Sequence, residues 1–212
     1  MATDTDLAAR IRRLEDREAI KELIARYGLV MDDRDMDGMP GLFTADVRIL
    51  SRDGVMDARG RDAAIALFRG RFTVLGPSNH FTHDKIIRFG DDPDEATGIV
   101  LSHAEMQRKG EPMLAAIRYT DRYRREDGAW RFAERLFDFF YYVPTAEYLD
   151  ALGPGLATRM RAYEEATGAD IPERLASWRA YYGDAPGPAP GEGGAPGEGA
   201  APGGGADAPG DS

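Results

Sequence analysis

Apolar residues recur at helical spacing near the start of the chain. Residues three or four positions apart lie on one face of a helix. Two such runs follow one another with a phase change near Asp16: Leu7, Ile11 and Leu14, then Ile20, Leu23, Ile24, Tyr27 and Val30. The pattern therefore predicts helices over about 7–30, which end before the glycine- and proline-containing stretch 38–41.

Residues 47–142 are typical of strands separated by turn sequences. Residues 47–60 carry Asp53-Gly54 between two β-type runs, which predicts a hairpin. A helix is expected at 60–72. Four long strand candidates then follow, with short Gly- and Asp-containing breaks between them: 79–89, 96–109, 113–125 and 130–142. Consecutive strands joined by tight turns favour an antiparallel meander.

The order of these elements predicts an α+β fold. Strict alternation places Ile99, Leu101 and His103 on one face of their strand. On the last strand it places one set of residues on a common face: Arg131, Ala133, Arg135, Phe137, Phe139 and Tyr141. Two further helices are expected at 145–152 and 154–182, the second interrupted by Pro172. Helices packed on a curved, mainly antiparallel sheet leave room for a small-molecule pocket between the two layers.

The last segment, 183–212, consists almost entirely of Gly, Ala, Pro, Glu and Asp. It contains no large apolar side chain, so it cannot bury enough surface to offset the entropy lost on ordering. We therefore divide the chain into a domain at 1–182, including its C-terminal helical extension, and a disordered tail at 183–212.

This division has a direct consequence for stability. Truncation after Tyr182 is expected to leave the melting temperature within about 2 °C of the full chain, because a segment without a core contributes little to folding. Calorimetry on the two proteins measures the difference, and a larger drop would show that the tail docks onto the domain.

Charge and composition narrow the possible partners. The chain has 27 Lys and Arg against 37 Asp and Glu, a formal net charge of −10. Such a chain lacks the clustered cations that nucleic acids and anionic membranes attract. It has no cysteine, which removes thiolate catalysis and Cys-based zinc sites. The first residues are charged and contain no apolar signal-peptide core, so we expect a cytoplasmic protein without nucleic-acid or membrane partners.

Three stretches carry a resemblance to a known family: LEDREAIKELIARYGLVMDDRD, NHFTH and AAIRYTDRYRREDGAWRFAERL. They resemble the SnoaL-like branch of the NTF2-like superfamily over about residues 7–145. The members include dehydratases, dehydrochlorinases and polyketide cyclases. The resemblance implies an NTF2-like cone of helices around a curved sheet, and a homo-oligomer, either a dimer or a trimer. An exposed convex sheet face that needs covering supports the same expectation.

The resemblance also implies catalytic residues. Asp32 matches the Asp of the family's catalytic pair, and His80, 48 residues later, matches its base. Tyr27 precedes Asp32 by a little over one helical turn, as a Tyr does in the dehydratases. His103 falls where relatives place a polar site residue. The family's usual HFxxN motif reads His80-Phe81-Thr82-His83-Asp84 here, so its Asn is not plainly present.

Each of these residues also has a purely structural interpretation. His80 is either a base oriented by Asp32 or a hydrogen-bonded core histidine. Tyr27 either binds a substrate oxygen or is a core aromatic. His103 either contributes to the site or is buried near Glu105. His83, three residues from His80, points to the opposite strand face, so a His-based metal site is not expected.

Three more residues are expected to bind substrate. Arg135 stands among apolar neighbours, where a charge needs a reason. It either binds an anionic or leaving group, or pairs with Asp32 or Glu105. Tyr119 and Phe137 belong to strands rich in aromatics, which would suit an aromatic or polycyclic substrate.

These features favour a cofactor-independent and metal-free lyase of the dehydratase type. His80, oriented by Asp32, removes a proton, and Tyr27, His103 or Arg135 assists the departing group. Isomerisation by proton shuttling uses the same residues. One alternative is a γ-formaldehyde lyase acting on lignin-type diaryl propanes. Another is a non-catalytic ligand-binding or assembly subunit, like the small β subunits of ring-hydroxylating dioxygenases.

Overall fold

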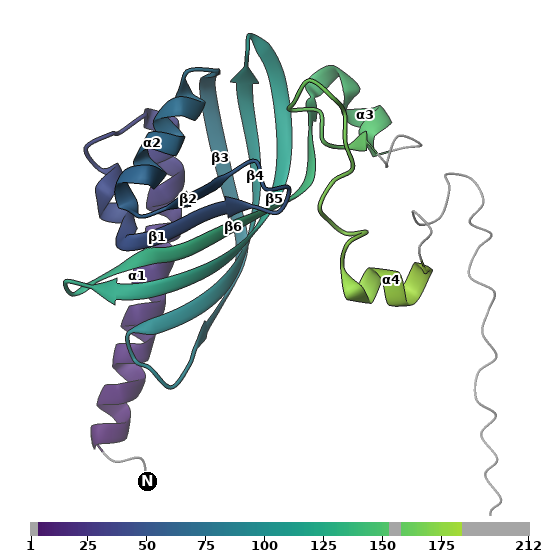
Figure 1. The fold of residues 1–212 in the computed structure, drawn as a ribbon. Coiled ribbons are helices and arrows are strands. Elements are labelled where there is room, and N and C mark those ends of the chain that lie inside the picture. Colours follow the sequence, from purple (N-terminus) through teal and green to yellow (C-terminus); the bar gives the residue numbers. More distant parts are fainter. Residues whose placement is uncertain (1–3, 153–157, 184–212) are drawn as a thin grey trace, which may run out of the picture.

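A long helix and a strongly curved sheet dominate the computed structural model, which describes residues 4–152 and 158–183 (Figure 1). The predicted tail from 184 onward lies outside the described residues. The elements in chain order are α1 (Asp4–Asp33), η1 (Met39–Leu42), β1 (Phe43–Ser51), β2 (Asp57–Arg59), α2 (Arg61–Phe72), β3 (Leu75–Phe89), β4 (Glu95–Arg108), β5 (Glu111–Glu126), β6 (Ala129–Pro144), η2 (Thr145–Glu147), α3 (Tyr148–Ala151) and α4 (Ala176–Tyr182).

The six strands form one sheet in the order β2-β1-β6-β5-β4-β3. All neighbouring pairs are antiparallel except β1 and β6, which run parallel. The four long strands follow one another as the predicted meander, and α1 and α2 lie on the same side of the sheet (Figure 1). The predicted α+β class is confirmed, and the core lies between these two helices and the inner sheet face.

Helix α1 differs from the two helical runs predicted around Asp16. It is one continuous helix of 30 residues. Its first apolar run is exposed, whereas the second is buried against the sheet. Asp16 lies where the exposed part of α1 gives way to the buried part. Its buried carboxylate accepts hydrogen bonds from Arg125 Nη2 (2.5 Å) and from Trp130 Nε1 (3.1 Å). The phase change in the apolar pattern therefore marks where α1 begins to pack against the sheet, and not where a second helix begins.

Strand β6 departs from the predicted strict alternation. Its pairing with β5 shifts register twice, at Ala133 and at Phe140, each of which is an extra residue opposite β5. A β-bulge of this kind reverses the face on which the following side chains lie. Tyr142 therefore joins Phe137 and Phe139 on the inner face. Tyr141, predicted to share that face, packs instead with Ala116 in a separate outer cluster.

The predicted helix at 154–182 is wrong for most of its described part. Only Ala176–Tyr182 is helical, and residues 158–175 wind irregularly along the end of the sheet (Figure 1). Met160 bridges Tyr142 and Thr167. The fully buried Arg159 donates to the Phe140 carbonyl (2.7 Å) and pairs with Glu173 (2.7 Å). Contacts with β6 thus override a weak helical pattern that Pro172 already interrupted.

Within the described ranges, no helix combines the length and apolar character needed to cross a bilayer.

The outer sheet face carries exposed apolar side chains, among them Phe81 (44% exposed), Ile86 (51%) and Leu101 (41%). We expect a dimer or trimer that covers this face. Light scattering should give two or three times the chain mass of 23.2 kDa. Leu101→Lys should shift the protein toward the monomer, while Leu29→Lys on exposed α1 should not. A wild-type mass of one chain would contradict the prediction.

Candidate functional site

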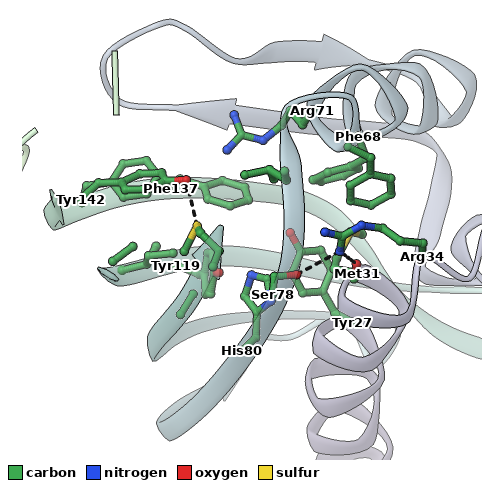
Figure 2. A pocket seen from close by; sticks show the side chains of 17 residues that line it. Tyr27, Met31, Arg34, Phe68, Arg71, Ser78, His80, Tyr119, Phe137 and Tyr142 are labelled. Carbon is green, nitrogen blue, oxygen red and sulfur yellow. Dashed lines mark hydrogen bonds between the residues drawn. The ribbon is translucent and has the colours of Figure 1, made fainter. Parts of the chain in front are cut away.

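A cavity of about 60 Å³ lies between the helices and the inner sheet face (Figure 2). Its walls are mainly aromatic and aliphatic. Polar side chains enter this lining from three elements: Arg34 from the turn after α1, Arg71 from α2, and Ser78 and His80 from β3. The aromatic lining residues are Tyr27, Phe68, Phe72, Tyr119, Phe137, Phe139 and Tyr142. An apolar pocket with few converging polar groups is the usual form of a small-molecule site.

Asp32 and His80 form a close pair at this cavity. The His80 ring nitrogen Nδ1 lies 2.6 Å from Asp32 Oδ1, and the His80 backbone N–H donates to Oδ2 at 2.7 Å. Asp32 occupies the last turn of α1, and His80 lies on β3, which passes beside it. The resemblance predicted this pair, and the fold brings the two side chains into direct contact.

Ser78 and Arg34 hold the Asp32 carboxylate in place. Ser78 lies two residues before His80, so the two share a strand face. Its hydroxyl donates to Asp32 Oδ1 (2.8 Å) and accepts from Arg34 Nη1 (2.9 Å). Arg34 takes a left-handed backbone conformation (φ 59°) just after α1, and its guanidinium also donates to the carbonyls of Met31 and Gly76. The carboxylate therefore accepts three hydrogen bonds in a fixed position.

The electrostatics keep Asp32 ionised. Partial burial acts to raise the pKa of this carboxyl group. The hydrogen bonds and charge of His80, together with the Ser78 hydroxyl, outweigh burial and hold the pKa of Asp32 below its ordinary value. An ionised carboxylate can only accept from His80 Nδ1, so in the neutral imidazole Nδ1 carries the proton and Nε2 has the lone pair. The pair has the electronic arrangement of a general base.

A buried ion pair lies behind Tyr27 and Tyr119, which line the cavity. Arg135 is fully buried, and its guanidinium donates twice to Asp121, at 2.9 Å and 2.8 Å. The guanidinium carbon lies 4.2 Å from the Tyr27 ring centroid and 4.1 Å from that of Tyr119. Burial works to lower the pKa of Arg135, but the charge of Asp121 prevails and raises it. Arg135 is therefore a permanent cation behind the cavity wall.

The sequence left two partners open for Arg135, namely Asp32 and Glu105, and neither is correct. The partner is Asp121, which lies directly opposite Arg135 in the pairing of β5 with β6. Tyr123 completes this group by donating to Asp121 Oδ2 (2.7 Å). Two polar atoms at this depth, Arg135 Nη1 and the Tyr119 hydroxyl, make no hydrogen bond of good geometry among the described residues, although Ser102 still acts to lower the pKa of Tyr119 and Arg135 that of Tyr27.

His103 is not at the cavity. It lies on the outer face of β4, where its Nδ1 is 2.8 Å from Nε2 of His83. Partial burial and the nearby His83 lower the pKa of His103. His83 also lies on the outer face, as its odd offset from His80 predicted. The site described by the structure therefore contains one histidine, and the predicted substrate-binding role of His103 has no geometric support at this cavity.

The predicted site residues thus fall into three groups. His80, Tyr27, Tyr119 and Phe137 line the cavity. Asp32 and Arg135 stand behind the lining and contact it. His103 lies across the sheet. Sequence reasoning missed Ser78, Arg34 and Arg71. Ser78 lies just before the strand predicted at 79–89, whereas β3 begins at Leu75, so the i, i+2 spacing from His80 was a usable signal only with the longer strand.

In the described part of the chain, no group of three or more metal-ligating side chains is close enough to hold an ion. The nearest arrangement is the outer His83–His103 pair, which has two nitrogen ligands against the three or four of typical protein zinc sites.

Comparison with known proteins identifies a family and relatives that are similar to this chain. The family description "SnoaL-like domain" matches residues 12–136. γ-Hexachlorocyclohexane dehydrochlorinase of Sphingobium indicum is 27% identical over 143 residues, covering 63% of this chain and 86% of that enzyme. The family match at 12–136 includes Asp32 and His80 and ends within β6 at Leu136.

Two solved structures from Novosphingobium aromaticivorans share the fold. An NTF2-like protein with a cystatin-like fold is 32% identical, with a TM-score of 0.53, and covers 65% of this chain and 90% of that one. A provisionally assigned scytalone dehydratase is 18% identical, with a TM-score of 0.61, and covers 76% and 96%. The chain is thus similar to these proteins over about two thirds to three quarters of its length.

Proposed function

This chain belongs to the SnoaL-like domain family, and from that premise we propose that it is a cofactor-independent lyase whose Asp32–His80 pair removes a proton from a substrate in the cavity. The observation that carries the proposal is the 2.6 Å contact between Asp32 Oδ1 and His80 Nδ1 beside an apolar cavity. The similarity to a dehydrochlorinase over 86% of that enzyme's length supports the same reaction class.

The proposed elimination balances within the site. The lone pair of His80 Nε2 takes a proton from a carbon atom, and the C–H electrons become the new C=C bond. The leaving group departs from the neighbouring carbon with its bonding electrons. The imidazolium then returns the proton to the departed hydroxide or to water. The ionised Asp32 stabilises the imidazolium while it exists.

Tyr119, which lines the cavity together with His80, supports assistance to the leaving group. Its hydroxyl is buried and makes no hydrogen bond of good geometry among the described residues, and the buried Arg135 cation lies behind it, 4.1 Å from the ring centroid. Unsatisfied buried donors cost free energy, and functional sites are where such groups are kept. Negative charge that develops during elimination is stabilised by donors already oriented in a dry site. Tyr27 adds a phenol, whose pKa burial raises despite the opposing charge of Arg135.

The cavity size limits the substrate. At about 60 Å³ it is well below the roughly 150 Å³ of an engineered cavity that holds benzene. A single-ring substrate enters only if side chains at the cavity shift, and a polycyclic one needs a larger opening. We therefore favour a compact, one-ring substrate over the polycyclic substrates that the sequence left open.

A substrate screen tests the proposal. The purified chain is incubated with γ-hexachlorocyclohexane and with one-ring secondary alcohols, and chloride release and alkene absorbance are followed. Activity of the wild type that disappears in the His80→Ala variant is the expected result. Turnover that persists unchanged in His80→Ala would contradict the assigned base.

Adding a lignin-type diaryl propane to the screen, with an assay for formaldehyde, also separates the alternatives. Formaldehyde released from a diaryl propane would indicate the γ-formaldehyde lyase reaction. Saturable ligand binding without turnover of any compound would favour a ligand-binding subunit. The hydrogen-bonded Asp32–His80 pair lies at a cavity that the surrounding side chains leave open. This favours an enzyme, because a purely structural core histidine needs no cavity beside it.

A further inference from the structure

Arg71 is a cation of the cavity that the proposed reaction does not use. It lies in the last turn of α2 and is one of the lining residues. Figure 2 shows Arg71 entering the pocket from α2 at a place separate from His80. Within residues 4–152 and 158–183 its guanidinium has neither a hydrogen-bonding nor an ion-pairing partner.

The other cavity arginine is already occupied. Arg34 donates to Ser78 Oγ, to Gly76 O and to Met31 O, and its guanidinium stacks 4.4 Å from the Phe72 ring centroid. Its role is to hold the turn that positions Asp32. Arg71 is therefore the one of the two whose five N–H donors remain available to a bound molecule.

The charge of Arg71 reaches the interior of the pocket. Burial raises the pKa of Tyr27 and of Tyr142, and in each case Arg71 is among the charges that act in the opposite direction. The same holds for Tyr163 in the C-terminal segment, whose pKa burial raises to about 12. Arg71 thus contributes a positive potential at the lining phenols Tyr27 and Tyr142, and at Tyr142 Arg108 acts in the same direction.

The lining of the cavity supplies no carboxylate for this cation. None of the 17 lining residues is acidic. Asp32 stands behind Ser78 and His80 and already accepts three hydrogen bonds. Arg71 is half-buried, so its guanidinium is partly shielded from water, and a ligand carboxylate can form charge-assisted hydrogen bonds with it.

We propose that the substrate carries a single carboxylate group, which Arg71 binds at the cavity while the ring occupies the aromatic interior. This inference rests on the proposed lyase function and names its substrate class, a one-ring aryl or alicyclic carboxylate. One free guanidinium matches one negative charge, which favours a carboxylate over a phosphate dianion. Binding of the carboxylate fixes the ring relative to His80, so Arg71 determines specificity and is not the base.

The test compares two probes of almost the same shape, benzoate and neutral benzamide, by titration calorimetry on the full chain. Wild type should bind benzoate about 10- to 100-fold more tightly than benzamide, the range expected from a hydrogen bond to a charged group. Arg71→Gln should abolish this preference. Arg69→Gln, an exposed cation of the same helical turn, should retain it.

Three results would overturn the proposal: a wild type without preference for benzoate, no benzoate binding at millimolar concentration, or a preference that survives in Arg71→Gln. Because the titration needs no turnover, it is independent of the lyase reaction. A benzoate preference in a protein that turns over nothing would contradict the proposed reaction alone. Turnover of neutral substrates without a benzoate preference would contradict the carboxylate alone.

Discussion

Replacing His80 with alanine is expected to lower kcat/KM by about 10²- to 10⁴-fold, the usual contribution of a general base. The reason is the loss of Nε2, the lone-pair nitrogen that Asp32 leaves at the cavity by holding Nδ1 at 2.6 Å. The substrate identified in the screen serves for the kinetics. The fold should survive, because His80 lines a cavity and is not part of the packed core, and circular dichroism checks this.

His83→Ala is the matched control. His83 is three residues away on the same strand, but it is exposed on the outer face and contacts His103. Its removal should leave kcat/KM within about twofold, since surface changes away from a site have small effects. A variant pair in which His83→Ala is inactive and His80→Ala is active would refute both the mechanism and the assigned faces of β3.

Asp32→Asn should reduce activity by a smaller factor than His80→Ala. The asparagine removes the negative charge that stabilises the imidazolium but leaves the histidine in place. The double variant should be little worse than His80→Ala alone, because residues that act as one unit have non-additive effects. EDTA should leave activity unchanged, since the base and the hydrogen-bond donors are all side chains. Inhibition by EDTA that zinc reverses would contradict this mechanism.

Asp121→Ala is expected to destabilise the fold by about 3–5 kcal/mol, the range observed when one partner of a buried ion pair is removed. Arg135 has no exposed surface, and its guanidinium carbon lies about 4 Å from each of three ring centroids, those of Tyr27, Tyr119 and Phe132. Without Asp121 this charge remains buried and uncompensated. Urea denaturation measures the loss in the free energy of unfolding.

Two controls define the origin of that loss. Asp46→Ala removes one of the two carboxylate partners of Arg124 at the surface and should cost no more than about 1 kcal/mol. The double variant Arg135→Met with Asp121→Leu should recover much of the stability, because a buried ion pair can be replaced by apolar side chains of similar volume. Equal losses for Asp121→Ala and Asp46→Ala would show that the buried pair has no special cost.

The site was predictable only in part. Family spacing led to Asp32 and His80, and strand alternation correctly placed His83 on the opposite face. Alternation also placed His103 with Leu101, but it carries no information on which face of the sheet meets the helices. That choice depends on where α1 packs, so the structure put His103 outside the cavity.

The sequence by itself determined the central elements, namely the strands, the helix between them and their order. Turns rich in glycine and aspartate separated the four long strands, because such signals act over a few residues. The sequence did not determine which side chains near the two ends of β6 lie on the inner face of the sheet. A bulge at Ala133 and another at Phe140 come from strand pairing, which involves residues far apart in the chain.

Only the tertiary structure decided which charges meet. Asp121 and Arg135 are brought opposite each other by the register of β5 and β6, and Arg34 reaches Ser78 across 44 positions of sequence. Arg71 has no sequence signal at all, since one arginine in a helix is normally a solvated surface residue. Its position in the cavity follows from how α2 packs against the sheet, and long-range packing of that kind is not encoded in any local pattern.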